Sequence, residues 1–184
     1  PLAMSDSLVC SRPMRGAPNI FLIGPMGSGK TAVGRSLARH LGKAFHDSDT
    51  EIVRRTGVDI PYIFEKEGEP GFREREREAI EALVALREIV LATGGGAILL
   101  PQNRCLLAER GCVVYLETSV AQQAQRVQHG RNRPLLANVE DPATRLRELM
   151  AIRDPLYRSI ADITVSTDGR RVKAVSEDIV RLLR

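Results

Sequence analysis

The stretch GPMGSGKT, residues 24–31, restricts the possible folds of this chain more than any other part of its sequence. It fits the pattern G-x-x-x-x-G-K-[ST] at every fixed position, and it lies between an apolar run and a helical pattern. Glycines let the backbone turn back and point its N–H groups inward, at the positive end of the following helix dipole. The sequence therefore predicts a strand, a phosphate-binding loop and a helix in direct succession.

The rest of the chain alternates short apolar runs with helix-length segments. The candidate strands are residues 20–23, 44–46, 89–93, 112–116 and 163–165, and the first helix is expected over residues 31–41, with Gly42 as its stop. Continuous apolar runs are typical of strands that are buried on both faces. Because strand–helix alternation favours βαβ units, we expect an α/β fold with a parallel sheet covered on both sides.

The chain has a length that suits one domain with a hydrophobic core. Residues 1–18 mix Ser, Pro, Arg and Gly without periodicity and predict a flexible leader. Because Pro1 is not a translation start, we expect the leader to include a cloning remnant. Residues 19–184 are then a single domain, in which residues 126–142 combine Gly, Pro and Asn with charges and predict a mobile lid.

The phosphate-binding loop predicts a nucleotide site but leaves the reaction open. Lys30 would reach the β- and γ-phosphates of ATP, and Thr31 would ligate Mg²⁺. The base-reading pattern N-K-x-D of GTP switches is absent, and no candidate strand ends in the Asp or Asp-Glu usual in motor ATPases. The predicted nucleotide contacts of the loop are Gly27, Ser28, Gly29, Lys30, Thr31 and Ala32.

Two carboxylates follow the second candidate strand in the stretch HDSDTE. A local interpretation is a helix cap, in which Ser48 and Glu51 form a capping box. However, ligands of parallel α/β sheets bind at the carboxyl ends of the strands. Asp47 could therefore hold a metal, and Asp49 could accept a proton from an attacking hydroxyl.

Arginines and glycines further along the chain complete the candidate site. In GFREREREAIEAL the charges alternate, and opposite signs meet at i,i+3, as in Arg73–Glu76 and Arg75–Glu78. We interpret most of this run as a solvent-exposed face. Arg73 is the exception, and we interpret it as a ligand residue. A turn needs fewer than three glycines, so the run of glycines at residues 94–96 indicates close approach of the backbone to a ligand. The basic loop with Arg126, Arg131 and Arg133 is either a solvated loop or a lid that brings an arginine onto a transferring phosphoryl group.

Composition excludes several classes of protein. The net charge of +4 suits an enzyme with anionic substrates, and it also admits nucleic acid. Few aromatic residues (4%) and the lack of an RNA-binding motif argue against a nucleic-acid-binding ATPase. No apolar run approaches the roughly 20 residues of a membrane span. The cysteines form no C-x-x-C pair, so the sequence indicates no zinc site, and we expect a cytoplasmic protein. We also expect a monomer.

Taken together and in this order, these motifs resemble the shikimate kinase family from about residue 19 onward. Beside the phosphate-binding loop, they are DSD after the second strand, FRERE as F-R-x-x-E, TGGG after the third strand, RPLL in the lid and R-x-P-L-Y at residues 153–157. The resemblance implies a three-layer α/β/α P-loop fold with a five-stranded parallel sheet in the order 2-3-1-4-5. It also implies Mg²⁺-dependent transfer of the γ-phosphoryl group of ATP to the 3-hydroxyl of shikimate, in the pathway to chorismate and aromatic amino acids.

The resemblance also implies roles for individual residues, with the acceptor region at about residues 47–80. Asp49, Arg73, the glycines Gly94, Gly95 and Gly96, and Arg153 would contact shikimate, and the two arginines would hold its carboxylate. Asp47 would hold Mg²⁺ through water, while Arg126, Arg133 and, by a loose match near the C-terminus, Arg170 would contact ATP. Without the family, the residues predict only a kinase of a small anionic polyol; gluconate kinase or a nucleoside-monophosphate kinase is the alternative.

Overall fold

The structure is a computed structural model that describes residues 18–127 and 141–184. The elements follow one another as β1 (Ile20–Ile23), α1 (Lys30–Leu41), β2 (Ala44–Asp47), α2 (Ser48–Thr56), α3 (Ile60–Val84), β3 (Ile89–Ala92), the 3-10 helix η1 (Ala97–Leu99), α4 (Pro101–Arg110), β4 (Cys112–Glu117), α5 (Val120–Val127), α6 (Pro142–Ile160), β5 (Ile163–Ser166) and α7 (Val172–Leu183). The five predicted strands are therefore confirmed, each to within one residue at its end.

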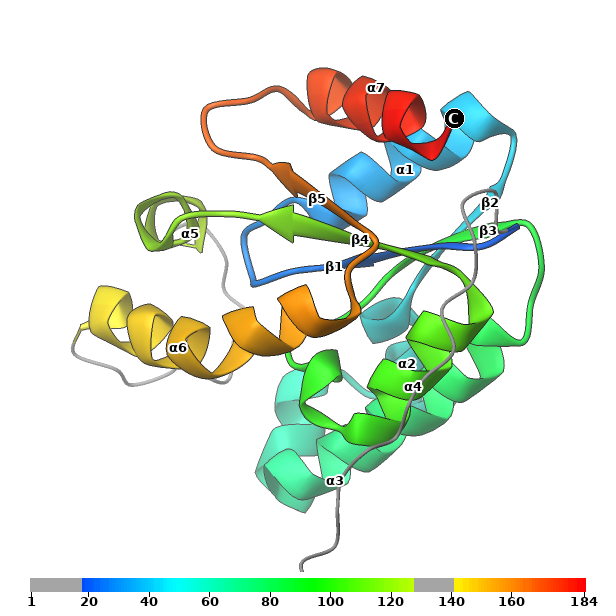
Figure 1. The fold of residues 1–184 in the computed structure, drawn as a ribbon. Helices are drawn as coiled ribbons and strands as arrows, with labels where there is room; N and C mark the ends of the chain where they lie inside the picture. Colours follow the sequence, from blue (N-terminus) through cyan, green and yellow to red (C-terminus); the bar gives the residue numbers. More distant parts are fainter. Residues whose placement is uncertain (1–17, 128–140) are drawn as a thin grey trace, which may run out of the picture.

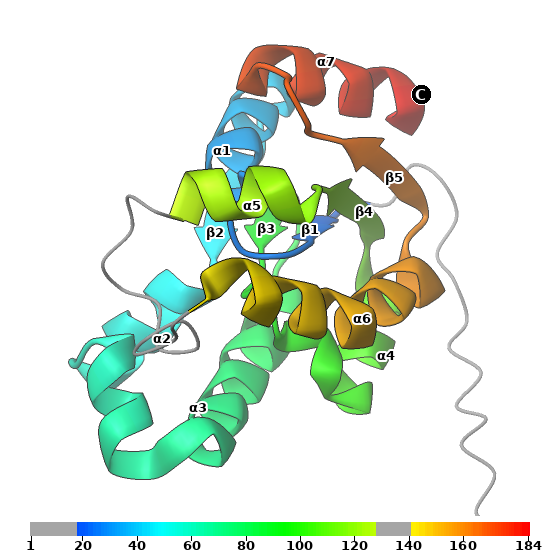
Figure 2. The ribbon, with the colours of Figure 1, turned by 90° about the vertical axis from the view of Figure 1, so that its left-hand side faces the viewer.

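The strands form one sheet in the order β2-β3-β1-β4-β5, and all paired neighbours run parallel. The predicted strand order is confirmed. In the centre, Ile20 pairs with Val90 on one side and with Cys112 on the other. Figure 2 looks along the sheet and shows the same strand order from β2 to β5.

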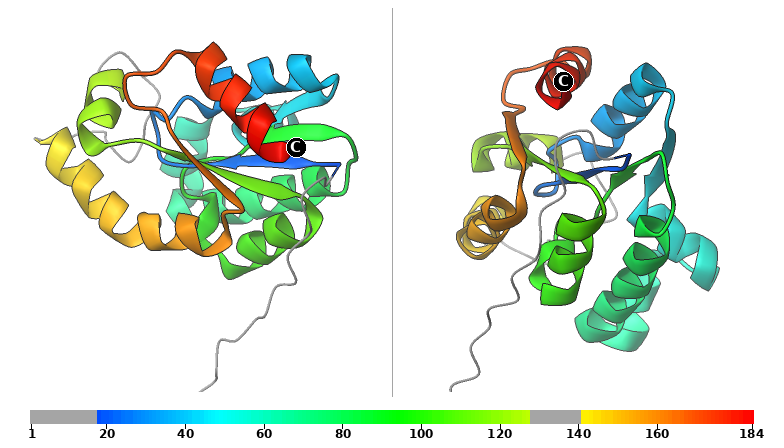
Figure 3. Two further views of the ribbon diagram at one scale, coloured as in Figure 1. Left: turned by 45° about the horizontal axis from the view of Figure 1, so that its top comes forward. Right: turned by 45° about the vertical axis from the view of Figure 1, so that its right-hand side comes forward.

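Two hydrophobic cores lie on opposite faces of the sheet, and β1 contributes to both by alternation of its side chains. Ile20 and Leu22 pack with the apolar sides of α1 and α7, whereas Phe21 and Ile23 pack with side chains of α3, α4 and α6. All four strand residues are buried, which is why the run is apolar throughout. Figure 1 and Figure 3 show α1 and α7 above the sheet and the other group of helices below it.

Glycines set both ends of α1. Gly29 at the N-cap and Gly42 at the C-cap have φ values of 86° and 66°, in the left-handed region that favours glycine. The predicted stop at Gly42 is confirmed. Because the loop ends at Gly29, the helix begins at Lys30, directly beside the carboxyl end of β1.

Helix α3 contains a kink that sequence periodicity did not predict. Gly68 has φ 70° and ψ −177°, so the chain leaves the helical conformation there and resumes it before Arg73. The kink brings Glu67 back to Arg75, at 2.8 Å between Nη2 and Oε1. Arg75 thus pairs with Glu67, and the predicted Arg75–Glu78 pair is wrong.

In the part of the chain that the structure describes, no helix combines the length and the apolar character that crossing a membrane requires.

Candidate active site

A cavity of about 400 Å³ opens at the carboxyl ends of β1, β2 and β3. One wall comes from the phosphate-binding loop and the start of α1, with Gly27, Gly29, Lys30, Thr31 and Ala32. The other predicted residues that line it are Asp47, Asp49, Gly94, Gly95 and Arg126. The fold therefore brings together predicted site residues from four separate segments of the chain.

The phosphate-binding loop is held by the side chain of Lys30. Its Nζ donates to the carbonyl oxygens of Gly24 and Pro25, each at 2.7 Å, and lies 3.2 Å from Ser28 Oγ. Gly24 must be glycine, because a Cβ on it would lie 2.7 Å from the carbonyl oxygen of Leu116. The loop thus keeps the Lys30 ammonium group at the cavity wall.

Asp47 closes the end of β2 and begins α2. Its Oδ1 accepts from the backbone N–H groups of Asp49 (3.0 Å) and Thr50 (3.3 Å), while its Oδ2 accepts from Thr31 Oγ1 at 2.9 Å. Asp47 is therefore the N-cap of α2. Its second oxygen and the Thr31 hydroxyl form a pair of oxygen ligands at the cavity, a donor set that suits Mg²⁺.

The alternative interpretation, a capping box of Ser48 and Glu51, is wrong. Ser48 is buried, and its Oγ accepts from the backbone N–H of Gly94 at 2.9 Å, while Glu51 pairs with Arg54 and Arg55. Because Asp47 satisfies the free N–H groups at the start of α2, Ser48 is available to link α2 to the glycine run.

Asp49 is partly buried, and its Oδ1 atom is buried without a hydrogen-bond partner among the described residues. Burial raises its pKa from 3.8 to about 7, and the negative charges of Asp47 and Glu76 add to the shift, against the opposing effect of Lys30 and Arg73. The side chain lines the cavity. A carboxylate with this pKa is suited to take a proton from a ligand near neutral pH.

Asp49→Asn is expected to stabilise the fold at high pH. The unfolded chain releases the proton near 3.8 and the folded chain near 7, so stability decreases as pH rises through this interval. At pH 8 the variant should gain on the order of 4 kcal/mol in the free energy of unfolding. At pH 4, where the folded protein keeps its proton, the gain should vanish. Urea denaturation of both proteins at the two pH values measures this difference, and a gain independent of pH would contradict it.

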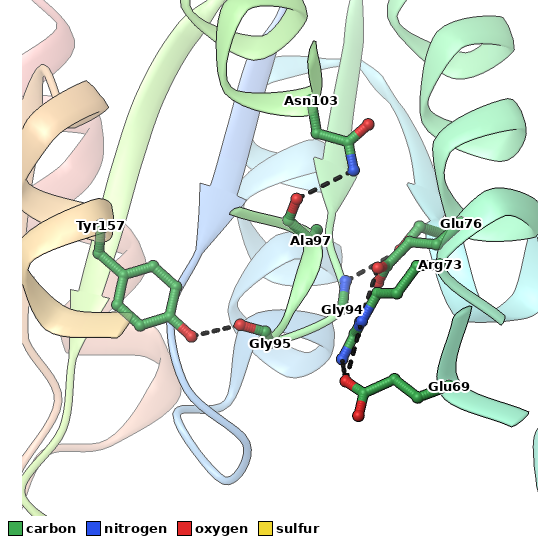
Figure 4. Close-up of polar contacts among 9 residues, drawn as sticks. Glu69, Arg73, Glu76, Gly94, Gly95, Ala97, Asn103 and Tyr157 are labelled. Carbon is green, nitrogen blue, oxygen red and sulfur yellow. Dashed lines mark hydrogen bonds and ion pairs between the residues drawn. The ribbon is translucent and has the colours of Figure 1, made fainter. Parts of the chain in front are cut away.

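Arg73 is buried and forms ion pairs with two glutamates. Its Nη1 donates to Glu76 Oε2 at 2.7 Å, and its Nη2 donates to Glu69 Oε1 at 2.9 Å (Figure 4). Glu76 is 0% exposed, so the prediction of a solvent-exposed face is wrong at this position. The i,i+3 spacing revealed the pair with Arg73 but not its burial, which the kink of α3 and the packing of the glycine run decide.

The glycine run of residues 94–96 is surrounded by charged side chains of the site. A Cβ on Gly94 would lie 2.4 Å from Glu76 Oε1 and 3.1 Å from Asp49 Oδ1, and one on Gly96 would lie 2.3 Å from Arg73 Nη2. A Cβ on Gly95 would be 3.6 Å from Nη1 of the buried Arg153. Glycines therefore let Arg73, Glu76 and Arg153 pack directly against this backbone.

Comparison with known proteins decides the family. The family model described as Shikimate kinase matches residues 26–184. The shikimate kinase of Thioalkalivibrio sulfidiphilus is 58% identical over 166 residues, which cover 90% of this chain and 87% of the relative. This chain belongs to the shikimate kinase family.

Solved structures agree with this membership of the shikimate kinase family. The structure of shikimate kinase from Acinetobacter baumannii in complex with shikimate has a TM-score of 0.89 and 52% identity, and covers 92% of this chain and 94% of that one. A gluconokinase from Sinorhizobium meliloti has a TM-score of 0.64 and 21% identity, covering 92% of this chain and 93% of its own, and shows a shared fold.

The remaining predicted residues of this shikimate kinase family member lie in different surroundings. Arg126 donates to the carbonyl oxygens of Gly27 (2.9 Å) and Thr167 (3.1 Å), and so joins the phosphate-binding loop to the segment after β5. Arg170 is not among the residues that line the cavity, and it pairs with Asp178. The predicted leader, apart from Pro18, and residues 128–140 of the predicted lid, with Arg133, lie outside the described residues.

Met26 and Thr93 also line the cavity of this shikimate kinase family member, although no sequence motif predicted them as site residues. Glu76 likewise had no predicted role in the site. Met26 occupies a variable position of the loop pattern, and Thr93 precedes the glycine run, so neither carries a signal of its own. For Glu76, the pattern F-R-x-x-E contains the position, and its fixed spacing from Arg73 was the available signal.

Proposed function

We infer that this chain transfers the γ-phosphoryl group of ATP to the 3-hydroxyl of shikimate, giving shikimate 3-phosphate and ADP. The observation that carries this inference is the arrangement of one cavity in a member of the shikimate kinase family. The phosphate-binding loop forms one wall, and Asp49, Gly94 and Gly95 also line the cavity. Two buried arginines, Arg73 and Arg153, pack against the same glycine run. This arrangement suits an anionic nucleotide on one side and a small hydroxy acid on the other.

On the donor side, we propose that the loop and the start of α1 bind the phosphates of ATP. The residues are Gly27, Ser28, Gly29, Lys30, Thr31 and Ala32. The Lys30 ammonium group would exchange its contacts with the loop carbonyls for contacts with phosphate oxygens. Arg126, which already contacts Gly27 and Thr167, would place the nucleotide base between these segments.

We propose that Thr31 and Asp47 hold Mg²⁺, directly or through water. The hydroxyl and carboxylate oxygens are 2.9 Å apart at the cavity, and hard oxygen ligands of this kind are those that Mg²⁺ prefers. The bound ion would offset the negative charge of the phosphate oxygens. Asp47 is well placed for this role because its other oxygen is fixed by the start of α2.

On the acceptor side, we propose that Arg73 and Arg153 bind the shikimate carboxylate. A planar guanidinium group donates two parallel hydrogen bonds to a carboxylate, which fixes the orientation of the ring. The glycines of residues 94–96 let the acceptor approach the backbone closely. Asp49 would then accept a hydrogen bond from the ring hydroxyls, through the oxygen that has no other partner among the described residues.

The proposed reaction needs orientation more than a strong base. The bond between the γ-phosphorus and the bridging oxygen of ADP breaks, and a bond from the shikimate 3-oxygen to the phosphorus forms. The hydroxyl proton passes to Asp49, whose pKa of about 7 permits it to hold that proton and later release it. Lys30 stabilises the charge that builds on the transferring oxygens.

A comparison of acceptors tests the proposed function. ADP release is measured with shikimate, gluconate and each nucleoside monophosphate, at equal ATP and Mg²⁺ concentrations. Turnover confined to shikimate would support the proposal, and turnover with another acceptor but not with shikimate would overturn it.

We further propose that the chain acts as a monomer, because every proposed contact comes from a single chain.

Arg73→Lys and Arg153→Lys are each expected to raise the KM for shikimate by about tenfold or more. Lysine keeps the positive charge but loses the second parallel hydrogen bond. Initial rates over a range of shikimate concentrations at saturating ATP measure this effect. Arg77→Lys is a matched control for Arg73→Lys, because Arg77 also lies on α3 and pairs only with Glu74 and Glu81 among the described ion pairs. If only the KM for ATP rises, the assignment of these arginines to the shikimate carboxylate is wrong.

A further inference from the structure

Three helices fix the backbone around the glycine run. The N–H of Gly94 donates to Ser48 of α2 at 2.9 Å. Asn103 of α4 donates to the carbonyl oxygen of Ala97 at 2.9 Å, a contact drawn in Figure 4. The third contact comes from α6, where the Tyr157 hydroxyl donates to the carbonyl oxygen of Gly95. A run of glycines has more conformational freedom than other sequences, so these side chains hold a backbone that would otherwise be mobile.

Tyr157 differs from the other two anchors because it also contacts a proposed ligand residue. Its side chain is 0% exposed, and its hydroxyl interacts with the guanidinium group of Arg153, one helical turn earlier on α6. Gly95 itself is next to Arg153, since a Cβ on it would lie 3.6 Å from Arg153 Nη1. One hydroxyl therefore connects the glycine run with the arginine that faces it.

We propose that Tyr157 is a positioning residue for the acceptor carboxylate. This inference rests on the proposed function, and it adds a residue to which no role in the reaction was assigned. By bonding Gly95 and Arg153 together, the Tyr157 hydroxyl sets the distance and angle between the guanidinium fork and the backbone of the glycine run. Both groups then meet the carboxylate without rearrangement, which lowers the cost of binding.

Tyr115 provides a matched control within the same aromatic pair. The two rings stack at a centroid distance of 4.9 Å and an interplanar angle of 23°, and both are fully buried. The Tyr115 hydroxyl, however, donates to Asp154 Oδ1 at 2.7 Å. Replacing either tyrosine by phenylalanine removes one buried hydroxyl and keeps the stack, but only Tyr157→Phe affects the glycine run.

The test compares Tyr157→Phe with Tyr115→Phe. We expect Tyr157→Phe to raise the KM for shikimate about tenfold, since a buried donor and acceptor lose their partner, and to change the KM for ATP less than about twofold. Tyr115→Phe should change the KM for shikimate less than about twofold. Thermal unfolding of both variants shows the cost to the fold. Equal effects of the two variants on the KM for shikimate, or an effect of Tyr157→Phe on ATP alone, would overturn the proposal.

A double-mutant cycle keeps the proposal testable if Tyr157→Phe also destabilises the fold. If Tyr157 acts through Arg153, the variant that combines Tyr157→Phe with Arg153→Lys should bind shikimate little worse than Arg153→Lys alone. Additive effects would indicate a merely structural role and overturn the inference. A wild-type enzyme that fails with shikimate would instead overturn the proposed function. Normal turnover of shikimate with an unchanged KM in Tyr157→Phe would reject the inference alone.

Discussion

Lys30→Met is expected to lower the turnover number by about 10³-fold, because it removes the positive charge that faces the transferring phosphoryl group. The Lys30 ammonium group lines the cavity and is held 2.7 Å from two loop carbonyls, which places it beside the proposed phosphate site. Methionine has a similar length and no charge, so packing should change little. Single-turnover formation of shikimate 3-phosphate at saturating ATP measures the loss.

Lys43→Met is the matched control for this change. Lys43 also donates to a backbone carbonyl at 2.7 Å, that of Pro18, and forms an ion pair with Glu88, but it lies outside the cavity lining. Its variant should keep nearly normal turnover. If Lys30→Met is folded, as judged by circular dichroism and thermal unfolding, and turns over within about tenfold of the wild type, the proposed role of Lys30 is wrong.

Asp49→Asn is expected to lower turnover by at least about 10²-fold, the effect of losing a general base. Asparagine keeps the size and one acceptor oxygen of Asp49 but cannot take a proton. A smaller loss would mean that Asp49 mainly positions the hydroxyl, since bond formation lags in the loose transition state. In the wild type, kcat/KM for shikimate should fall below about pH 7, because protonation occupies the oxygen that must accept the hydroxyl proton. The variant should lose this dependence.

Asp47→Asn distinguishes the role of Asp47 from that of Asp49, because the proposed role of Asp47 is to hold Mg²⁺ beside Thr31. Its defect should be partly relieved when the Mg²⁺ concentration is raised, whereas that of Asp49→Asn should not. Rates measured over a range of Mg²⁺ concentrations distinguish the two variants. If raised Mg²⁺ relieves the defect of Asp49→Asn but not that of Asp47→Asn, the two roles are exchanged. If both variants turn over normally, these residues serve only to begin helix α2.

Local chemistry explains why much of the fold was predictable from sequence. A strand such as residues 20–23 must be apolar throughout when it is buried on both faces, and Gly29 and Gly42 are needed wherever φ is positive at a helix end. These requirements act on neighbouring residues, so they leave a pattern in the sequence. The phosphate-binding loop is of the same kind, and it predicted the positions of Lys30 and Thr31 at the cavity.

The family resemblance supplied the strand order, the identity of the acceptor and the role of Arg153. The residues alone had predicted Asp49, Arg73 and the glycine run as site residues, but only a small anionic polyol as the acceptor. Arg153 illustrates the difference. On its own helix nothing marks it, and only the fold places it beside Gly95, which is distant in sequence. Contacts between remote segments depend on how the helices pack on the sheet, and a single sequence does not record that packing.

By itself, therefore, the sequence determined the strands, the phosphate-binding loop and the type of fold, because each follows from the conformations and burial of adjacent residues. Only the tertiary structure decided which side chains become buried partners. It made Asp47 the helix cap in place of Ser48, buried Glu76 in a run that looked solvent-exposed, and brought the Tyr157 hydroxyl to Gly95. The physical reason is that burial and hydrogen bonding between distant segments depend on the relative placement of whole elements, here the kink of α3 at Gly68 and the packing of α6 against the glycine run.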